Sequence, residues 1–308
     1  MTKKRKKKKS LLSFFKSTII SLLMIIAALS GIYCARIYTT PYSSIVDMFH
    51  EDTLDDVVIS KEKCNILILG TDKGGTLTDV MMLAQIDPNT QKAVVMSIPR
   101  DTYIKYNGRM MKINQVHSIG HRNGKRGSET AILAVKELTG IPINHFVKVN
   151  FDAFESCIDE LGGVEFDVPQ RMKYKDPYQD LDIDLMPGMQ HLDGDKAEQL
   201  IRFRRYKNGD IDRIKVQQDF LHELASQKLQ LKYIGKIDDI YSIISEDMET
   251  SMTPGDIVQC GMQLLSIGTE NIQTFTLPHS MVEGASYVKP VYGEIKNVRE
   301  STFGYAAE

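Results

Sequence analysis

The sequence has few of the residues and motifs that mark common hydrolytic active sites. Its four cysteines, Cys34, Cys64, Cys157 and Cys260, include no C-x-x-C pair, so neither a zinc site nor a disulfide framework is indicated, and we expect small core residues. The seven histidines form no H-E-x-x-H set, which disfavours zinc hydrolysis. A G-x-S-x-G elbow and a G-x-x-x-x-G-K-[ST] loop are also missing, which disfavours serine-based acyl transfer and a P-loop.

Acidic residues are absent before Asp47, whereas Lys3 to Lys9 are seven consecutive bases and Lys16 adds an eighth. Of 38 basic residues, these eight leave 30 against 40 acids, so Ser17 to Glu308 carries a net charge of −10. Hydrophobic residues make up 42% of the chain, which excludes a fully disordered protein. The pattern is that of a basic tip on an acidic globular body.

An uncharged, mostly apolar run of 19 residues, Ser17 to Ala35, follows the basic tip. This length is close to what a helix needs to cross a bilayer, and the positive-inside rule places residues 1–16 in the cytoplasm. A cleaved signal peptide is the alternative, although no small-x-small cleavage site ends the run. Nucleic-acid binding by the lysine run is a weaker alternative beside a spanning segment. We therefore expect a single-pass cell-membrane anchor at 17–35 and no nucleic-acid partner.

Strands and helices are predicted to alternate in the outer part of the chain, after a stalk at residues 36–62. Apolar runs and turn residues predict strands at Asn65–Leu69, Val80–Ile86, Ala93–Ile98, Ile143–Val149, Val164–Val168 and Ile272–Leu277. Capping signals predict helices at Ser128–Thr139, Phe151–Leu161, Gly194–Leu200, Ile211–Gln230 and from Thr253 onward. This order predicts one extracytoplasmic α/β domain at 63–308, an α-β-α sandwich with a mixed central sheet. The last 30 residues show little periodicity.

The first polar cluster that follows an apolar strand contains two acids. Asp72 and Asp79 flank the glycine-rich loop Lys73-Gly74-Gly75, which can fold back and bring both carboxylates together. Hard oxygen ligands of this kind suit Mg²⁺, and Mg²⁺ suits a substrate phosphate. The alternative is an ordinary polar loop with turn aspartates.

The second cluster is Ser97-Ile98-Pro99-Arg100-Asp101. Pro99 cannot continue a central strand, so Arg100 is presented where the strand ends. Its guanidinium is a planar fork of donors that matches phosphate or carboxylate geometry. Asp101 either orients Arg100 or caps the next turn. A simple surface ion pair remains the alternative.

The third cluster runs from Arg202-Phe203-Arg204-Arg205 to Gly209–Arg213 and Gln217-Gln218. If Arg202 and Arg204 face one anion, the preceding helix must end by about Leu200, because residues two apart diverge on a helix. A solvated basic face is the alternative, but concentrated arginine is more telling on an acidic body. A metal site and several fixed arginines are typical of phosphoryl transfer.

These clusters, in this order, resemble the LytR-CpsA-Psr family of cell-wall glycopolymer ligases. The matching runs are Ile66–Asp101, Lys112–Asn114, Leu161–Val164 and Leu192–Gln218. The resemblance implies the family's α/β fold and a transferase of a Gram-positive-type bacterium that acts on an undecaprenyl-pyrophosphate-linked glycopolymer, such as teichoic acid or capsular polysaccharide. A peptidoglycan sugar hydroxyl would attack the phosphate that carries the polymer and release undecaprenyl phosphate. The lipid tail would lie in an apolar channel beneath the site.

The resemblance also implies roles for individual residues. Asp72 and Asp79 correspond to the acids of a Mg²⁺ site, and Asp79 also belongs to the catalytic set. Arg100, Arg202 and Arg204 correspond to the arginines that bind the diphosphate and stabilise charge. The residues implied in substrate binding are Asp101, Lys112, Asp210, Arg213 and Gln217.

Two departures from the family's pattern leave other functions open. Leu77 and Val216 stand where the family commonly has arginine, and Lys73 or Lys112 would have to supply a missing phosphate contact. The alternatives are a non-catalytic membrane-bound regulator or glycan-binding scaffold, and a polyprenyl-pyrophosphate hydrolase that uses water.

Overall fold

The computed structural model describes most of the chain after the predicted stalk. The described residues are 62–71, 77–122, 127–176, 181–207, 209–230, 233, 236, 239–240, 242–243 and 249–306. The predicted tip, span and nearly all of the stalk lie outside them. Within this part of the chain, no helix combines the length and apolarity that crossing a membrane requires. The chain divides into units of Met1–Asp56 and Val57–Glu308, and every described element belongs to the second.

A mixed six-stranded sheet forms the centre of this unit, which confirms the predicted α/β class. Its strands are β11 (Glu249–Thr250), β6 (His145–Val149), β1 (Cys64–Thr71), β2 (Thr78–Asp87), β3 (Lys92–Ser97) and β12 (Ile272–Thr276), in that spatial order. Strand β2 is antiparallel to both β1 and β3. Strands β6 and β12 pair in parallel with β1 and β3.

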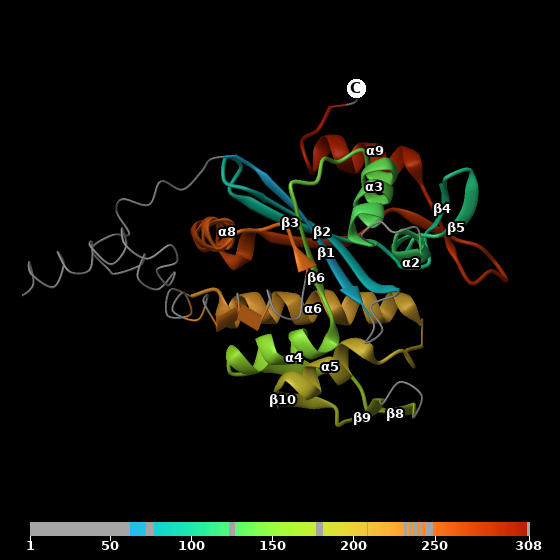
Figure 1. The fold of residues 1–308 in the computed structure, drawn as a ribbon. Coiled ribbons are helices and arrows are strands. Elements are labelled where there is room, and N and C mark those ends of the chain that lie inside the picture. Colours follow the sequence, from blue (N-terminus) through green and yellow to red (C-terminus); the bar gives the residue numbers. More distant parts are fainter. Residues whose placement is uncertain are drawn as a thin grey trace, which may run out of the picture. The chain divides into compact units, whose positions relative to one another are not determined.

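One face of the sheet is covered by three helices. They are α2 (Asn114–Arg122), α3 (Gly127–Thr139) and α9 (Tyr292–Ser301), and Figure 1 shows α3 and α9 lying over the sheet. Leu67 and Leu69 alternate along β1 and share a core with Val135 of α3. Helix α3 ends as predicted, because Gly140 adopts φ 67° and donates its N–H to the carbonyl of Lys136 at 2.8 Å.

The other side of the sheet carries four helices among the elements that the structure describes in full. They are α8 (Pro254–Ile267), α6 (Asp210–Lys228), α4 (Phe151–Glu160) and α5 (Gly194–Arg202), with α4 and α5 beneath α6 in Figure 1. Side chains cap two of these helices: the Thr253 hydroxyl accepts from the Asp256 N–H in a capping box, and the Asp193 carboxylate accepts from the Lys196 N–H.

Four two-stranded antiparallel sheets accompany the central sheet in the described part of the chain, and the sequence predicted only one of their strands. They are β4–β5 (Tyr103–Tyr106, Arg109–Lys112), β7–β10 (Val164–Val168, Gly188–Leu192), β8–β9 (Met172–Asp176, Leu181–Leu185) and β13–β14 (His279–Met281, Val288–Pro290). A short 3₁₀ turn, Thr269–Asn271, precedes β12. Strands β7, β8 and β9 pack with α4, α5 and α6 in a core of their own.

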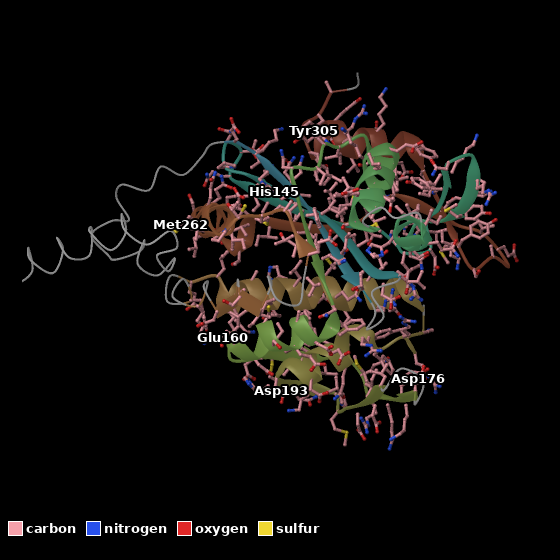
Figure 2. The ribbon with its side chains drawn as sticks, viewed as in Figure 1. His145, Glu160, Asp176, Asp193, Met262 and Tyr305 are labelled. Carbon is pink, nitrogen blue, oxygen red and sulfur yellow. The ribbon has the colours of Figure 1, made fainter. Side chains whose placement is uncertain are left out.

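The C-terminal segment packs on the sheet although its sequence lacks periodicity. Phe303 is buried, and its carbonyl accepts from the Gln85 amide at 3.1 Å. The Asn65 amide donates to the hydroxyl of Tyr305 at 2.6 Å, and Figure 2 shows Tyr305 beside α9. These bonds satisfy two buried polar side chains of β1 and β2, so the segment is part of the fold.

Candidate active site

The described residues of the three predicted polar clusters meet at one edge of the sheet. Strands β1, β3, β6 and β12 all end at this edge, because β1 and β3 are both antiparallel to the strand between them. Asp79 is the second residue of β2, and Arg100 follows the end of β3. Carboxyl ends of strands are where open α/β sheets place their ligands.

Asp79 is the centre of the charged cluster. Its two carboxylate oxygens accept from Arg100 Nη1 at 2.5 Å and from Arg204 Nη2 at 2.9 Å. Burial alone would raise the pKa of Asp79, but the charges of Arg204 and Arg100 outweigh it and hold that pKa below its ordinary value. Asp79 is therefore an ionised anchor that fixes two arginines from distant parts of the chain.

Arg100 joins Asp79 to a second carboxylate. Its Nε lies 3.9 Å from Asp210 at the start of α6, and Arg213 Nη2 binds the same Asp210 at 2.7 Å. Burial of the Arg213 side chain, which is 3% exposed, lowers its pKa to about 10. Among the described residues, the Nε atoms of Arg100 and Arg213 and the hydroxyl of Thr78 have no hydrogen-bond partner. Buried hydrogen-bond donors that lack an acceptor are typical of a site that binds an anion.

Lys112 is linked to the cluster by its ion pair with Asp101. Its Nζ binds Asp101 Oδ1 at 2.8 Å, and the other carboxylate oxygen of Asp101 lies 3.9 Å from Arg100 Nε. The fold thus brings together seven of the ten residues that the sequence singled out: Asp79, Arg100, Asp101, Lys112, Arg204, Asp210 and Arg213.

Arg202 was expected to face the anion only if the preceding helix ended by about Leu200. Helix α5 instead continues to Arg202, so this condition is not met. The Arg202 Nη1 binds Glu198 Oε1 at 2.5 Å across one helical turn, with both side chains 7% exposed. Its guanidinium also lies 4.5 Å from the ring centroid of Phe151. The intrahelical pair carries the helix past Leu200. The catalytic role of Arg202 stays a prediction.

A polar hollow of about 190 Å³ adjoins the arginines. It is lined by Tyr174, Leu181, Arg202, Arg204 and Arg205. The Arg205 guanidinium lies 4.6 Å from the ring centroid of Tyr174 in the β8–β9 hairpin. Sequence reasoning missed Tyr174, because nothing local to this hairpin indicates that it folds back on the arginines. Arg205 could have been identified from the concentration of arginines in this segment of the sequence.

The two glutamines of the third cluster tie elements together. Gln217 donates to the carbonyl of Ile201 at 3.0 Å, which holds α6 to α5, and its binding role stays a prediction. Gln218 donates to Ser97 Oγ at 2.9 Å, which holds α6 to the end of β3. Of the two departures from the family pattern, Leu77 is partly exposed, whereas Val216 is buried in an apolar core.

Two apolar cavities adjoin α6, one between α6 and the sheet and the other between α6 and α8. The cavity near Asp79, called the proximal cavity, has about 220 Å³ and is lined by Ile68, Gly70, Val80, Met82, Val149, Asn150, Phe151, Phe154, Ile201, Gln217, Phe220, Leu221 and Leu224. The distal cavity has about 300 Å³ and is lined by Leu161, Leu221, Leu224, Ala225, Lys228, Leu229, Gln230, Tyr233, Ile240, Ile257, Val258, Gly261, Met262, Leu264, Leu265 and Ile272. Leu221 and Leu224 of α6 line both.

The proximal cavity adjoins the charged cluster through α6, because Arg213 reaches the backbone of Asp79 and Gln217, one helical turn later, lines the cavity. Gly70 pairs with Val80 across β1 and β2, and a Cβ at Gly70 would lie 2.9 Å from the Val80 Cβ. Any larger residue would therefore push into β2 at a residue that lines the cavity. An anion site and an apolar space are thus adjacent.

The predicted magnesium site is only half described. Asp72 lies outside the described residues, and both carboxylate oxygens of Asp79 are engaged by arginine. Across the described ranges, no three His, Cys, Asp or Glu side chains come close enough to hold a metal ion. Asp79 alone is not a metal site, so magnesium binding depends on Asp72.

Comparison with known proteins finds a matching family model, similar sequences and similar structures. The sequence model of the LytR_cpsA_psr family matches residues 36–303. The polyisoprenyl-teichoic acid–peptidoglycan teichoic acid transferase TagU of Oceanobacillus iheyensis is 30% identical over 218 residues, which cover 69% of this chain and 66% of the relative. The corresponding transferase TagV of Bacillus subtilis is 31% identical over 207 residues, which cover 64% of this chain and 51% of the relative.

The chain therefore matches between half and two thirds of the length of these curated relatives. The crystal structure of B. subtilis TagV superposes on this chain with a TM-score of 0.66 at 27% identity, covering 79% of this chain and 96% of the chain in that crystal structure. The fold around the charged cluster is thus the fold of a solved relative.

Proposed function

The chain belongs to the LytR-CpsA-Psr family, and on this premise we propose that it is a phosphotransferase that moves a glycopolymer from an undecaprenyl-pyrophosphate carrier to a peptidoglycan sugar hydroxyl. The relatives named above are teichoic acid transferases, which supports a polymer of the teichoic acid type. Capsular polysaccharide is the other candidate polymer.

The observation that carries this proposal is the contact between the charged cluster and the proximal cavity. A polyprenyl pyrophosphate is an amphiphile with a diphosphate head and an apolar tail. Arg100, Arg204 and Arg213 offer charged donors to the head, and the proximal cavity offers a dry surface to the tail. The polymer, which hangs from the outer phosphate, would extend over the hollow lined by Tyr174 and Arg205.

The reaction exchanges one phosphoester partner for another. The acceptor hydroxyl oxygen bonds to the phosphorus that carries the polymer, and the bond from that phosphorus to the bridging oxygen breaks. The lipid leaves as undecaprenyl phosphate, and the hydroxyl proton passes to solvent or to a carboxylate of the cluster. Negative charge grows on the leaving phosphate and on the oxygens of the transferred group, so fixed guanidinium groups lower the barrier.

Asp79 prepares the arginines for this task. In the absence of substrate its carboxylate holds Arg100 and Arg204 in place, so their ordering is complete before the substrate binds. A diphosphate competes for the same guanidinium groups. Each arginine that turns to the phosphates releases an oxygen of Asp79.

Magnesium is the proposed cofactor, held by Asp79 together with Asp72. Bound there, it would neutralise charge on the diphosphate. The support is the ionised state of Asp79 and its position at the start of β2, next to the loop that contains Asp72. The released oxygens of Asp79 are the ligands that this ion needs.

The proposed location is the outer surface of the cell membrane. The basic tip at 1–16 and the apolar run at 17–35 support a single-pass anchor with the domain outside, where both the lipid carrier and the peptidoglycan acceptor are found.

The test is an assay on the full chain in detergent with Mg²⁺ and a labelled undecaprenyl-pyrophosphate glycan, with and without peptidoglycan oligosaccharide. We expect label on the oligosaccharide and little cleavage without it. Cleavage that does not depend on the acceptor would make the protein a hydrolase. Binding of the labelled lipid without any cleavage would make it a scaffold or regulator.

A further inference from the structure

The edge of the sheet opposite Asp79 carries a second group of reactive side chains. A polar hollow of about 270 Å³ opens there between the start of β1, the start of β6 and α8. Its lining includes Glu62, Lys63, Cys64, His145, Asp256 and Cys260. Figure 2 labels His145 on this side of the sheet. No element of the proposed transfer reaction uses this hollow.

Two cysteines in this lining are neighbours in the fold. Cys64 is the first residue of β1 and is half-buried, whereas Cys260 is in the middle of α8 and is 8% exposed. Both are free, both line the same hollow, and both pack in one apolar cluster with Ile66 and Ile267. The sequence predicted small core residues and indicated no disulfide framework, but the fold makes these two cysteines neighbours.

We propose that Cys64 and Cys260 are a reversible redox pair that forms an intramolecular disulfide by exchange with an external small-molecule or protein disulfide. The Cys64 thiolate attacks one sulfur of the external disulfide, and the other sulfur leaves as a thiolate. Cys260 then attacks the Cys64 sulfur and releases the second external thiolate. The two thiol protons go to the leaving thiolates, and the external disulfide takes up two electrons as two thiols.

The surroundings assign the attacking role to Cys64. Interaction with the Cys260 side chain lowers the pKa of Cys64, against the opposing effects of burial and of Asp256. The same interaction and burial raise the pKa of Cys260. Cys64 is also the more exposed of the two. A thiolate at the hollow, backed by a buried second thiol, is the arrangement of an attacking and a resolving cysteine.

A metal site is the other function that two cysteines beside His145 and Asp256 suggest. The described residues do not support it, because no three such side chains lie within reach of one ion. Cys157 on α4 gives the contrast, since burial raises its pKa to about 11 and no second cysteine adjoins it among the described thiols.

The bridge would tie α8 to the sheet. Helix α8 supplies Ile257, Val258 and Met262 to the distal cavity, so a link from Cys260 to β1 fixes one wall of that cavity. The bond would also close a loop that contains most of the domain, and closing a long loop in the unfolded chain favours the folded state.

The direct test is disulfide mapping on the full chain in detergent, first reduced and then treated with oxidised glutathione. After alkylation and digestion, mass spectrometry should find the peptides of Cys64 and Cys260 joined, with Cys157 alkylated. The Cys157→Ser variant should keep the bridge, whereas Cys64→Ser should lose it. Alkylation of both Cys64 and Cys260, glutathione that stays on Cys64, or a bridge between two chains would overturn the proposal.

A second readout is thermal unfolding. Oxidation should raise Tm by roughly 5 to 15 °C and a reductant should reverse the rise. Neither Cys64→Ser nor Cys260→Ser should show the shift, and α8 should exchange its amide hydrogens more slowly only in the oxidised wild type. An equal Tm in both redox states of the wild type would contradict the proposal. None of these measurements depends on transferase activity, so the result is independent of the proposed function.

Discussion

Arg100 and Arg202 are both arginines beside a carboxylate, but their surroundings differ. Arg202 binds Glu198 within one helix, both side chains are 7% exposed, and the guanidinium lies over the ring of Phe151. Arg100 shares its carboxylate with Arg204, is 20% exposed, and has an Nε without a hydrogen-bond acceptor in the described part of the chain. A buried ion pair within one helix stabilises the fold, whereas a more exposed cluster with an unpaired buried donor is suited to receive another anion.

The largest effect is expected from breaking the more exposed cluster. Arg100→Ala should lower kcat for transfer by about 10²- to 10³-fold, because a fixed donor to developing charge is lost. The matched control is Arg109→Ala, an exposed arginine on the nearby β5, which should keep normal activity. Transfer by Arg100→Ala within tenfold of wild type would remove Arg100 from the catalytic set.

Breaking the buried ion pair should act on stability first. Arg202→Ala leaves Glu198 buried without its partner and should lower the free energy of unfolding by about 3 to 5 kcal/mol, measured by urea denaturation. Arg204→Ala is the comparison, because its side chain is 42% exposed, and it should lose less than about 1 kcal/mol. A fully stable but inactive Arg202→Ala would instead place Arg202 beside Arg100 as a substrate-binding arginine.

The apolar side of the site is tested at Leu224, which lines both cavities. Leu224→Trp should raise KM about tenfold for a long polyprenyl carrier, roughly 1.4 kcal/mol, and leave KM for a short-chain carrier unchanged. Leu133→Trp, at an exposed site on the other face of the sheet, should change neither. Equal effects on both carriers would mean that the tail does not lie in these cavities.

The smallest effect concerns acid stability. The pKa of Asp79 is lower in the folded protein than its ordinary value of 3.8. Its stabilising contribution is therefore complete above about pH 4 and is lost as pH falls through the lowered pKa. Asp79→Asn should remove this part of the acid dependence of the denaturation midpoint below pH 4. An acid dependence identical to that of wild type would show that the arginines do not stabilise the ionised carboxylate.

Most regular elements could be predicted, because their signals are local. The glycine that ends α3, the capping box before α8 and the apolar run of β1 each act over a few residues. The short hairpins were missed, although the strand Leu181–Leu185 alternates buried and exposed residues. A strand pair of this length is marginal alone and depends on the α5 and α6 surfaces that cover it.

The sequence predicted the three clusters of the site, but it did not predict how their side chains pair. The pairing of Asp79 with Arg204 spans 125 positions and has no local signal. The pair of Glu198 and Arg202 did have a local signal, because these residues are four positions apart in a segment already predicted as helical up to Leu200. That spacing indicated a longer α5. The proximity of Cys64 and Cys260 again depends on tertiary packing, which spacing along the chain does not encode.

The most direct test of phosphotransfer is the identity of the lipid product. The full chain would be incubated with Mg²⁺, an undecaprenyl-pyrophosphate glycan and peptidoglycan oligosaccharide, and the products would be separated and weighed by mass spectrometry. We predict one undecaprenyl phosphate for each oligosaccharide that gains a glycan, with a phosphate in the new linkage. Release of undecaprenyl pyrophosphate with no phosphate in the linkage would show attack at the sugar carbon and would contradict phosphoryl transfer.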